Sequence, residues 1–124
     1  MEYLLSYKLF ENAETRKWRL SSSIKIAKER DINIEEGKYI RLFHGTSPAN
    51  FKKILKSCMF KSGTFFAVDF DTSKTYANMT VTGKKESVVT MVYINAEALL
   101  PLGEYWVLQE PVYQKGITNF YDPK

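Results

Sequence analysis

The sequence predicts an α+β domain in which most strands are antiparallel. The chain has 124 residues, which is enough for one hydrophobic core and too few for two, so we expect a single domain over residues 1–124. Helical and strand-like patterns alternate through the first two thirds, and several strand-like segments follow. The links between those late strands are too short for the crossover helices that parallel strands require.

The N-terminal residues 1–38 predict a helical lead-in. The first ten residues are rich in Tyr, Leu and Phe and fit either a short strand or the start of a helix. From about Ala13 to Arg30 the composition is helical and charged, with Trp18 among the apolar anchors. Three consecutive serines at 21–23 weaken that helix, because serine is a poorer helix former than alanine or leucine.

A strand followed by a helix comes next. Tyr39–Phe43 alternates apolar and polar residues and leads directly into His44-Gly45-Thr46. Ser47 is a favourable N-cap and Pro48 a favourable first-turn residue, so we expect a helix to begin there.

One face of this second helix is predicted to be buried. Phe51, Ile54, Leu55 and Cys58 recur at the spacing that places side chains on one side of a helix. We therefore expect Cys58 to be a buried, small hydrophobic residue.

The remaining elements are shorter. Gly63–Ala67 predicts a strand, and Asp69 or Asp71 can cap a following helix. Polar residues at Thr80–Glu86 predict a loop. Three further strands are expected, with Pro111 between the last two: Val88–Ile94, Glu104–Leu108 and Val112–Gln114.

Composition restricts the possible environments and ligands. The net charge of +4 favours phosphate-bearing ligands or nucleic acid in a weak, long-range way, although solvated lysine-rich helix faces are the more common explanation. A single cysteine rules out an internal disulfide and fits a reducing compartment. No apolar run approaches the length of a membrane span, and the N-terminus lacks signal-peptide features. We expect a cytoplasmic protein, or one delivered into the cytoplasm of a target cell.

Several common site types are missing from the sequence. One histidine, one cysteine and scattered carboxylates give no metal-ligand spacing, so we expect no metal cofactor. The chain contains no P-loop and no G-x-G-x-x-G motif. It also lacks the G-x-S-x-G turn that holds the serine nucleophile of many hydrolases.

Three segments carry the most informative residues: LFHGTSPANFKKIL at 42–55, GTFFAVDFDTSKTYA at 63–77 and GEYWVL at 103–108. Taken one at a time, a histidine or an aromatic residue in such segments is more often a core residue than a ligand. Taken together, the segments resemble the catalytic domain of the ADP-ribosyltransferases, in the branch of the poly(ADP-ribose) polymerases and diphtheria toxin. The resemblance covers roughly residues 40–110 and implies a compact fold built on a split, mostly antiparallel sheet flanked by helices.

The first part of the resemblance is its histidine and the strand that follows. The family's histidine corresponds to His44 and its adjoining glycine to Gly45. The family's G-x-Y-F-A strand corresponds to Gly63–Ala67. Phe65 replaces the family's tyrosine at this strand, which keeps an aromatic face and removes the phenol hydroxyl.

The second part comprises a helical pair and a late glutamate. The family's helical serine and tyrosine correspond to Ser73 and Tyr76, at the family's spacing and without a gap. Its E-Y-x-V strand, which begins with the catalytic glutamate, corresponds to Glu104–Val107. Glu110 is the alternative, being the other acidic residue of this region.

The resemblance implies a role for each of these residues in binding NAD⁺. The faces of Phe65 and Tyr76 would enclose the planar, cationic nicotinamide ring. The Gly45 backbone and the Ser73 hydroxyl would hydrogen-bond the carboxamide. Two further side chains would hold the ribose hydroxyls, namely His44 and Thr46.

Catalysis would depend on Glu104, with His44 as the second catalytic residue that the resemblance implies. Cleavage of the nicotinamide–ribose bond passes through an oxocarbenium-like transition state, which a carboxylate beside the ribose stabilises. The chain lacks the long insertion that polymerising members carry before this glutamate, so we expect transfer of a single unit.

The implied function is a mono-ADP-ribosyltransferase with NAD⁺ as co-substrate. Its acceptor would be a protein or a nucleic acid, and small domains of this kind include toxins, effectors and phage-related factors. A toxin would be expected to have a neutralising partner protein. The candidate phosphate contacts for a nucleic-acid acceptor are Lys52, Lys53, Lys56, Lys84 and Lys85. Three alternatives remain: an NAD⁺ glycohydrolase, an RNA 2′-phosphotransferase, and an inactive module that binds NAD⁺, ADP-ribose or nucleic acid.

Overall fold

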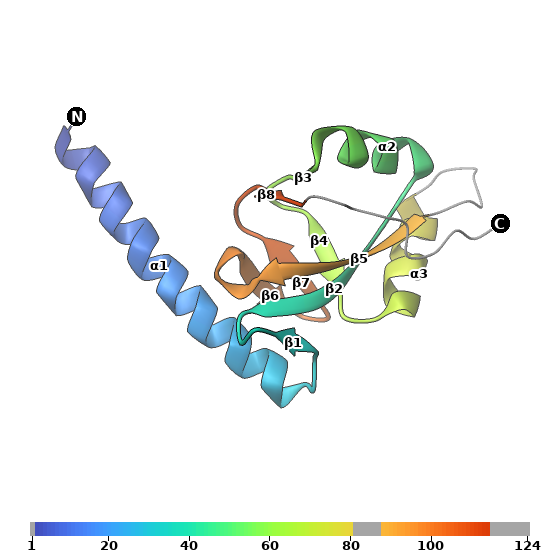
Figure 1. Cartoon of the computed structure of the whole chain (residues 1–124), viewed down its shortest axis with the longest axis horizontal. Coiled ribbons are helices and arrows are strands. Elements are labelled where there is room, and N and C mark those ends of the chain that lie inside the picture. The colour runs from blue at the N-terminus through green and yellow to red at the C-terminus, as the bar shows by residue number, and fades with distance from the viewer. Residues whose placement is uncertain (1, 81–87, 115–124) are drawn as a thin grey trace.

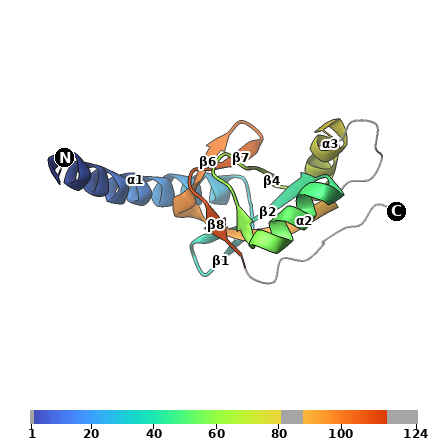
Figure 2. The same cartoon turned by 90° about the horizontal axis from the view of Figure 1, so that it is seen from above.

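A computed structural model describes residues 2–80 and 88–114, excluding the side chains of residues 2–12, 76 and 78–80. Within these ranges the chain is an α+β protein with antiparallel sheets, as the sequence predicts (Figures 1 and 2). The elements, in chain order, are α1 Glu2–Glu29, β1 Ile34–Glu35, β2 Tyr39–Thr46, α2 Pro48–Ser57, β3 Met59–Phe60, β4 Phe65–Ala67, α3 Phe70–Thr80, β5 Val88–Asn95, a short 3₁₀ helix η1 at Ala96–Ala98, β6 Leu99–Leu102, β7 Tyr105–Leu108 and β8 Val112–Tyr113.

Helix α1 is longer than the sequence indicates. It begins at Glu2 rather than near Ala13, so residues 2–10 are helical, and its N-terminal part extends away from the rest of the molecule (Figure 1). The serines at 21–23 do not interrupt it. Ser23 is buried and its hydroxyl donates to the Leu99 carbonyl oxygen at 3.2 Å. A small side chain at this position therefore allows α1 to lie against β6.

The main sheet is divided between β2 and β4. Its strand order is β1-β2-β4-β7-β6, and β5 also pairs with β2. Strands β2 and β5 stay in register over the whole of β2, from Tyr39 to Thr46. Strands β2 and β4 share a single register pair, Phe43 with Ala67. The paired strands β3 and β8 form a separate two-stranded sheet.

The two faces of β2 have different neighbours. Ile40 and Leu42 point into the hydrophobic core, which also receives Phe66, Trp106 and the Ala27 methyl of α1. The alternate position Gly45 faces α3. Because side chains alternate along a strand, His44 lies on the same side of β2 as Leu42.

Helix α2 begins as predicted and ends differently. The Ser47 hydroxyl caps it by accepting from the Asn50 amide at 3.1 Å, and Phe51 is buried. The prediction that Leu55 and Cys58 complete the buried face is wrong, since Leu55 is 41% exposed and Cys58 is also exposed. The helix ends at Ser57, and Cys58 adopts a left-handed backbone (φ 57°) that turns its side chain off the helical face.

Helix α3 is capped by Asp69, one of the two residues that the sequence offers for this role. The Asp69 carboxylate accepts from the Thr72 amide at 2.7 Å. Helix α3 then lies directly against β2. A β-carbon placed on Gly45 would overlap the Ser73 carbonyl oxygen and would lie 2.9 Å from the Ala77 β-carbon. Glycine is therefore required here by the close approach of helix and strand.

The late strands follow the predicted order with some changes. Strand β5 runs one residue beyond the predicted Val88–Ile94, and β7 begins at Tyr105, one residue after Glu104. The short strand β8 pairs with β3, and Leu99–Leu102 forms the additional strand β6. Neither this pairing nor β6 is predicted from the sequence. Of the predicted loop at Thr80–Glu86, Thr80 is the last residue of α3 and the others lie outside the described residues.

No helix in the described part of the chain combines the length and the apolar character that crossing a membrane requires.

The packing at Gly45 gives a first testable prediction. We expect Gly45→Ala to lower the free energy of unfolding by about 1–3 kcal/mol, because the added methyl meets the rigid backbone of α3. Denaturant unfolding followed by circular dichroism measures this change. Adding Ala77→Gly should not restore stability, since the nearest obstacle is the Ser73 carbonyl. An unfolding free energy that Gly45→Ala leaves unchanged would contradict the described packing.

Candidate functional site

His44 spans the division between β2 and β4. Its Nδ1 lies 2.9 Å from the carbonyl oxygen of Phe65. A carbonyl oxygen only accepts hydrogen bonds, so Nδ1 carries the proton and donates it. The centroid of the His44 ring also lies 5.5 Å from that of the Phe60 ring and 5.6 Å from that of the Phe66 ring. Beyond the Phe43–Ala67 pair, this side chain therefore links the two strands.

The protonation of His44 follows from its surroundings. Burial among aromatic rings lowers the pKa of His44 below its usual 6.5, and the hydrogen bond to Phe65 opposes this only in part. The ring is neutral at physiological pH, with its proton on Nδ1. Its other nitrogen, Nε2, is consequently a hydrogen-bond acceptor.

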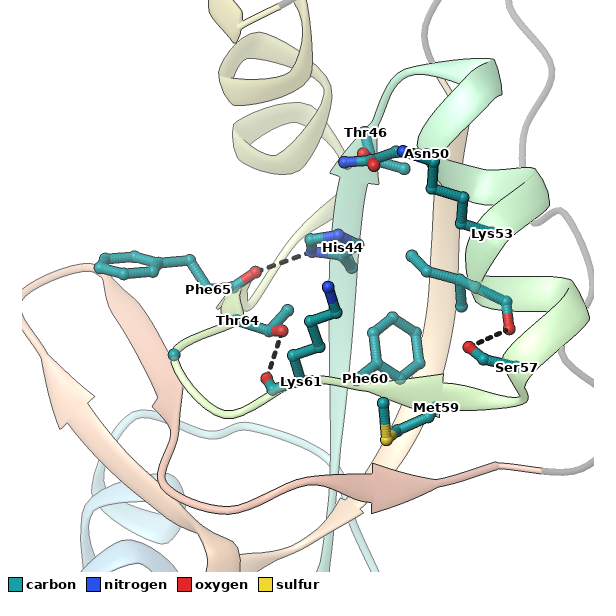
Figure 3. Close-up of a pocket in the computed structure, with 13 residues that line it drawn as sticks. His44, Thr46, Asn50, Lys53, Ser57, Met59, Phe60, Lys61, Thr64 and Phe65 are labelled. Atoms are coloured by element: carbon teal, nitrogen blue, oxygen red, sulfur yellow. Dashed lines mark hydrogen bonds between the residues drawn. The ribbon is translucent and has the colours of Figure 1, made fainter.

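A large cavity, hereafter the main cavity, adjoins His44. It has a volume of about 370 Å³ and lies between β2, α2 and the connection from β3 to β4 (Figure 3). This size is typical of a small-molecule site. The structure gathers at this cavity four of the residues that the sequence predicts for NAD⁺, namely His44, Gly45, Thr46 and Phe65. The full lining is His44, Gly45, Thr46, Asn50, Lys53, Ile54, Ser57, Met59, Phe60, Lys61, Gly63, Thr64 and Phe65.

A much smaller cavity lies on the α3 side of the sheet. Its volume is about 10 Å³, enough for about one water molecule. Gly45 and Phe65 line both cavities, and Ser73 lines only the small one. The Ser73 hydroxyl is buried and has no hydrogen-bond partner among the described residues. The small cavity therefore contains a polar group suited to a ligand but no room for an aromatic ring as it stands.

The predicted ring-stacking pair is only partly described. Phe65 is half-buried, and its ring meets the Tyr105 ring edge-on at 6.0 Å. Tyr76 lies in α3, but its side chain is outside the described residues. At Gly45, the space that a side chain would occupy is filled by α3. Gly45 itself borders both cavities.

Glu104 lies apart from these residues. It occupies the two-residue turn between β6 and β7 and lines a third cavity, of about 270 Å³. The other lining residues of that cavity are Arg30, Ile32, Val68, Asp69 and Thr72, none of which borders the first two cavities. The structure therefore does not bring Glu104 and His44 together.

Glu110, the alternative glutamate, is engaged elsewhere. Its carboxylate forms an ion pair with Arg16 of α1. The Arg16 guanidinium also forms an ion pair with the Glu97 carboxylate, with an N–O distance of 3.2 Å. Glu110 borders none of the three cavities described above. Its position supports a role in holding α1 against the body of the protein.

Two residues of the main cavity were missed or differently interpreted at the sequence level. Lys61 follows the short strand β3, which has no recognisable period in the sequence because it contains only Met59 and Phe60. The sequence predicts Lys53 only as a phosphate contact for a nucleic-acid acceptor. Lys84 and Lys85, considered for the same role, lie outside the described residues.

Comparison of the chain with models of protein families, with curated proteins and with solved structures finds no match.

The buried His44 predicts how stability depends on pH. Its pKa is lower in the folded than in the unfolded chain, so the unfolded chain binds more protons as the pH falls below 6.5. We expect the contribution of His44 to stability to be full above that pH and to decline on acidification. His44→Gln should remove this component. The test is unfolding free energy measured from about pH 8 to about pH 5; identical profiles for both proteins would contradict it.

The unpartnered Ser73 hydroxyl gives a second prediction for the site. Ser73→Ala removes a buried polar group that lacks a partner, so the protein without ligand should become more stable by about 1 kcal/mol. The same variant should bind NAD⁺ about threefold to tenfold more weakly. Thermal unfolding and calorimetric titration measure the two effects. Loss of stability without loss of binding would show that the hydroxyl serves the fold.

Proposed function

We propose that this chain binds NAD⁺ beside His44 and transfers its ADP-ribose, as a single unit, to a macromolecular acceptor. The observation that carries this proposal is the position of His44 at the division of the sheet. Its Nδ1 is committed to Phe65, which leaves Nε2 as an acceptor on a side chain that lines a cavity of about 370 Å³. Thr46 and Phe65 border the same cavity. The motif resemblance over residues 40–110 supports the same ligand.

The proposed binding mode uses both sides of Phe65. A ribose hydroxyl donates to His44 Nε2, and Thr46 provides a further hydroxyl nearby. The carboxamide of the nicotinamide ring bonds the buried Ser73 hydroxyl. Because the cavity at Ser73 measures only about 10 Å³, this mode requires Phe65 or α3 to move when the ring enters.

The proposed reaction breaks one bond and forms another at the same carbon. The bond between ribose C1′ and the nicotinamide nitrogen breaks, and its electron pair leaves with nicotinamide, which becomes neutral. The acceptor's nucleophile forms the new bond to C1′ and loses a proton to solvent. The developing oxocarbenium charge would be stabilised by the Glu104 carboxylate, which must first approach the His44 cavity.

A second candidate function is supported by the position of Glu104. In this structure the carboxylate lines a cavity that is separate from the one beside His44. A chain that keeps this arrangement when bound would hold NAD⁺ or ADP-ribose without cleaving it, as a binding module.

Nicotinamide release tests the proposal. Incubation of the protein with NAD⁺ should release nicotinamide, the rate should rise when cell extract is added, and labelled ADP-ribose should remain on a macromolecule. Release without extract and without transfer would indicate a glycohydrolase. Binding of NAD⁺ with no release under either condition would indicate the binding module and contradict the transferase.

The glutamate assignment has a matched control within the chain. Glu104→Gln should lower the rate of nicotinamide release by about 10²–10³ while NAD⁺ binding stays within about twofold, because the carboxylate acts on the transition state. Glu110→Gln should leave the rate of release nearly unchanged, since Glu110 pairs with Arg16. The opposite result, with release lost only in Glu110→Gln, would overturn the assignment of Glu104.

A further inference from the structure

The main cavity carries two cationic side chains on different walls. Lys53 belongs to α2, and Lys61 lies in the connection from β3 to β4 (Figure 3). In the close-up, the Lys61 side chain extends along the cavity toward His44, and Lys53 lies on the α2 side near Asn50. Lys53 and Lys61 therefore border the main cavity from two separate elements.

No carboxylate balances these charges at the cavity. The lining residues include two lysines and no aspartate or glutamate. Neither lysine belongs to an ion pair among the residues that the structure describes. Like charges around a concave surface raise the local positive potential, and a bound anion relieves it. The main cavity therefore favours a negatively charged ligand.

We propose that Lys53 and Lys61 bind the diphosphate of a nucleoside diphosphate group, so that this cavity selects its ligand by the number of phosphates. The inference rests on the proposed function in taking NAD⁺ as the ligand, whose two phosphates stand between its two riboses. With His44 and Thr46 on the β2 wall to hold a ribose, the lysines are placed to hold the adjoining phosphates. The lysine ammonium is a point charge on a flexible side chain and has three hydrogen-bond donors. It can therefore follow a flexible diphosphate, which a donor group of fixed geometry cannot.

The selection by phosphate number is testable with ADP, AMP and adenosine. Calorimetric titration of the full chain at low ionic strength should show ADP binding more tightly than AMP, and AMP more tightly than adenosine. The double variant Lys53→Gln/Lys61→Gln should weaken ADP binding by about tenfold or more and change adenosine binding by less than about twofold. Higher salt should reduce the preference for ADP in the unmodified protein.

A matched control exists on helix α1. Lys17 and Lys25 are exposed residues of α1 outside the cavity lining, so Lys17→Gln/Lys25→Gln removes the same charge without touching the site. ADP binding by this control should stay within about twofold of the unmodified protein. Equal losses in both double variants would overturn the inference, because they would indicate a general effect of net charge. Equal affinities for ADP and adenosine in the unmodified protein would overturn it as well.

The outcome is separable from that of the proposed function. ADP binding that depends on Lys53 and Lys61, in a protein that releases no nicotinamide from NAD⁺, would support the diphosphate site and contradict the transferase. Nicotinamide release that is insensitive to the lysine substitutions would do the reverse. A short single-stranded RNA that binds through these lysines where ADP does not would overturn the nucleoside diphosphate assignment.

Discussion

The hydrogen bond from His44 to the Phe65 carbonyl is the interaction on which the proposed site depends. Strands β2 and β4 share one register pair, so a side chain rather than a backbone ladder connects them beyond Phe43. The gap that results is where the main cavity lies. By donating from Nδ1 the imidazole fixes its own tautomer, and it thereby presents Nε2 as an acceptor. One residue thus both holds the divided sheet together and supplies a polar group for a ligand.

The two sides of Phe65 differ in a way that bears on function. On the α2 side the cavity is open and cationic, whereas on the α3 side it is nearly closed and contains the unpartnered Ser73 hydroxyl. The closure comes from the close packing of α3 against Gly45. A ligand with a phosphate-bearing half and an aromatic half would therefore meet an accessible subsite first. Entry of its ring would require the packing around Phe65 to change.

The starts of helices α2 and α3 can be predicted from the sequence, because residues close in the chain determine them. Ser47 and Asp69 cap helices because their side chains accept from amides three residues ahead, which a sequence shows directly. Cys58 was misplaced because a left-handed residue ends α2 early, and helical spacing does not reveal where a helix ends.

The spatial relations of the site were beyond the reach of the sequence. Lys61 joins the cavity through a strand too short to show a period, so its proximity to His44 depends on tertiary packing. The spacing of motifs likewise does not determine which way a hairpin turn faces, and Glu104 lies in such a turn. His44 and Thr46 belong to one continuous strand, and both line the main cavity.

The most direct test of the proposed role of His44 is the ¹⁵N chemical shift of its ring nitrogens during titration with NAD⁺. These signals are readily assigned, because the chain contains one histidine. We expect Nδ1 to keep its proton throughout and the Nε2 resonance to shift until saturation, because Nε2 accepts a hydrogen bond from the ligand. An Nε2 resonance that stays unchanged while NAD⁺ binds elsewhere, or a proton found on Nε2 in the free protein, would contradict it.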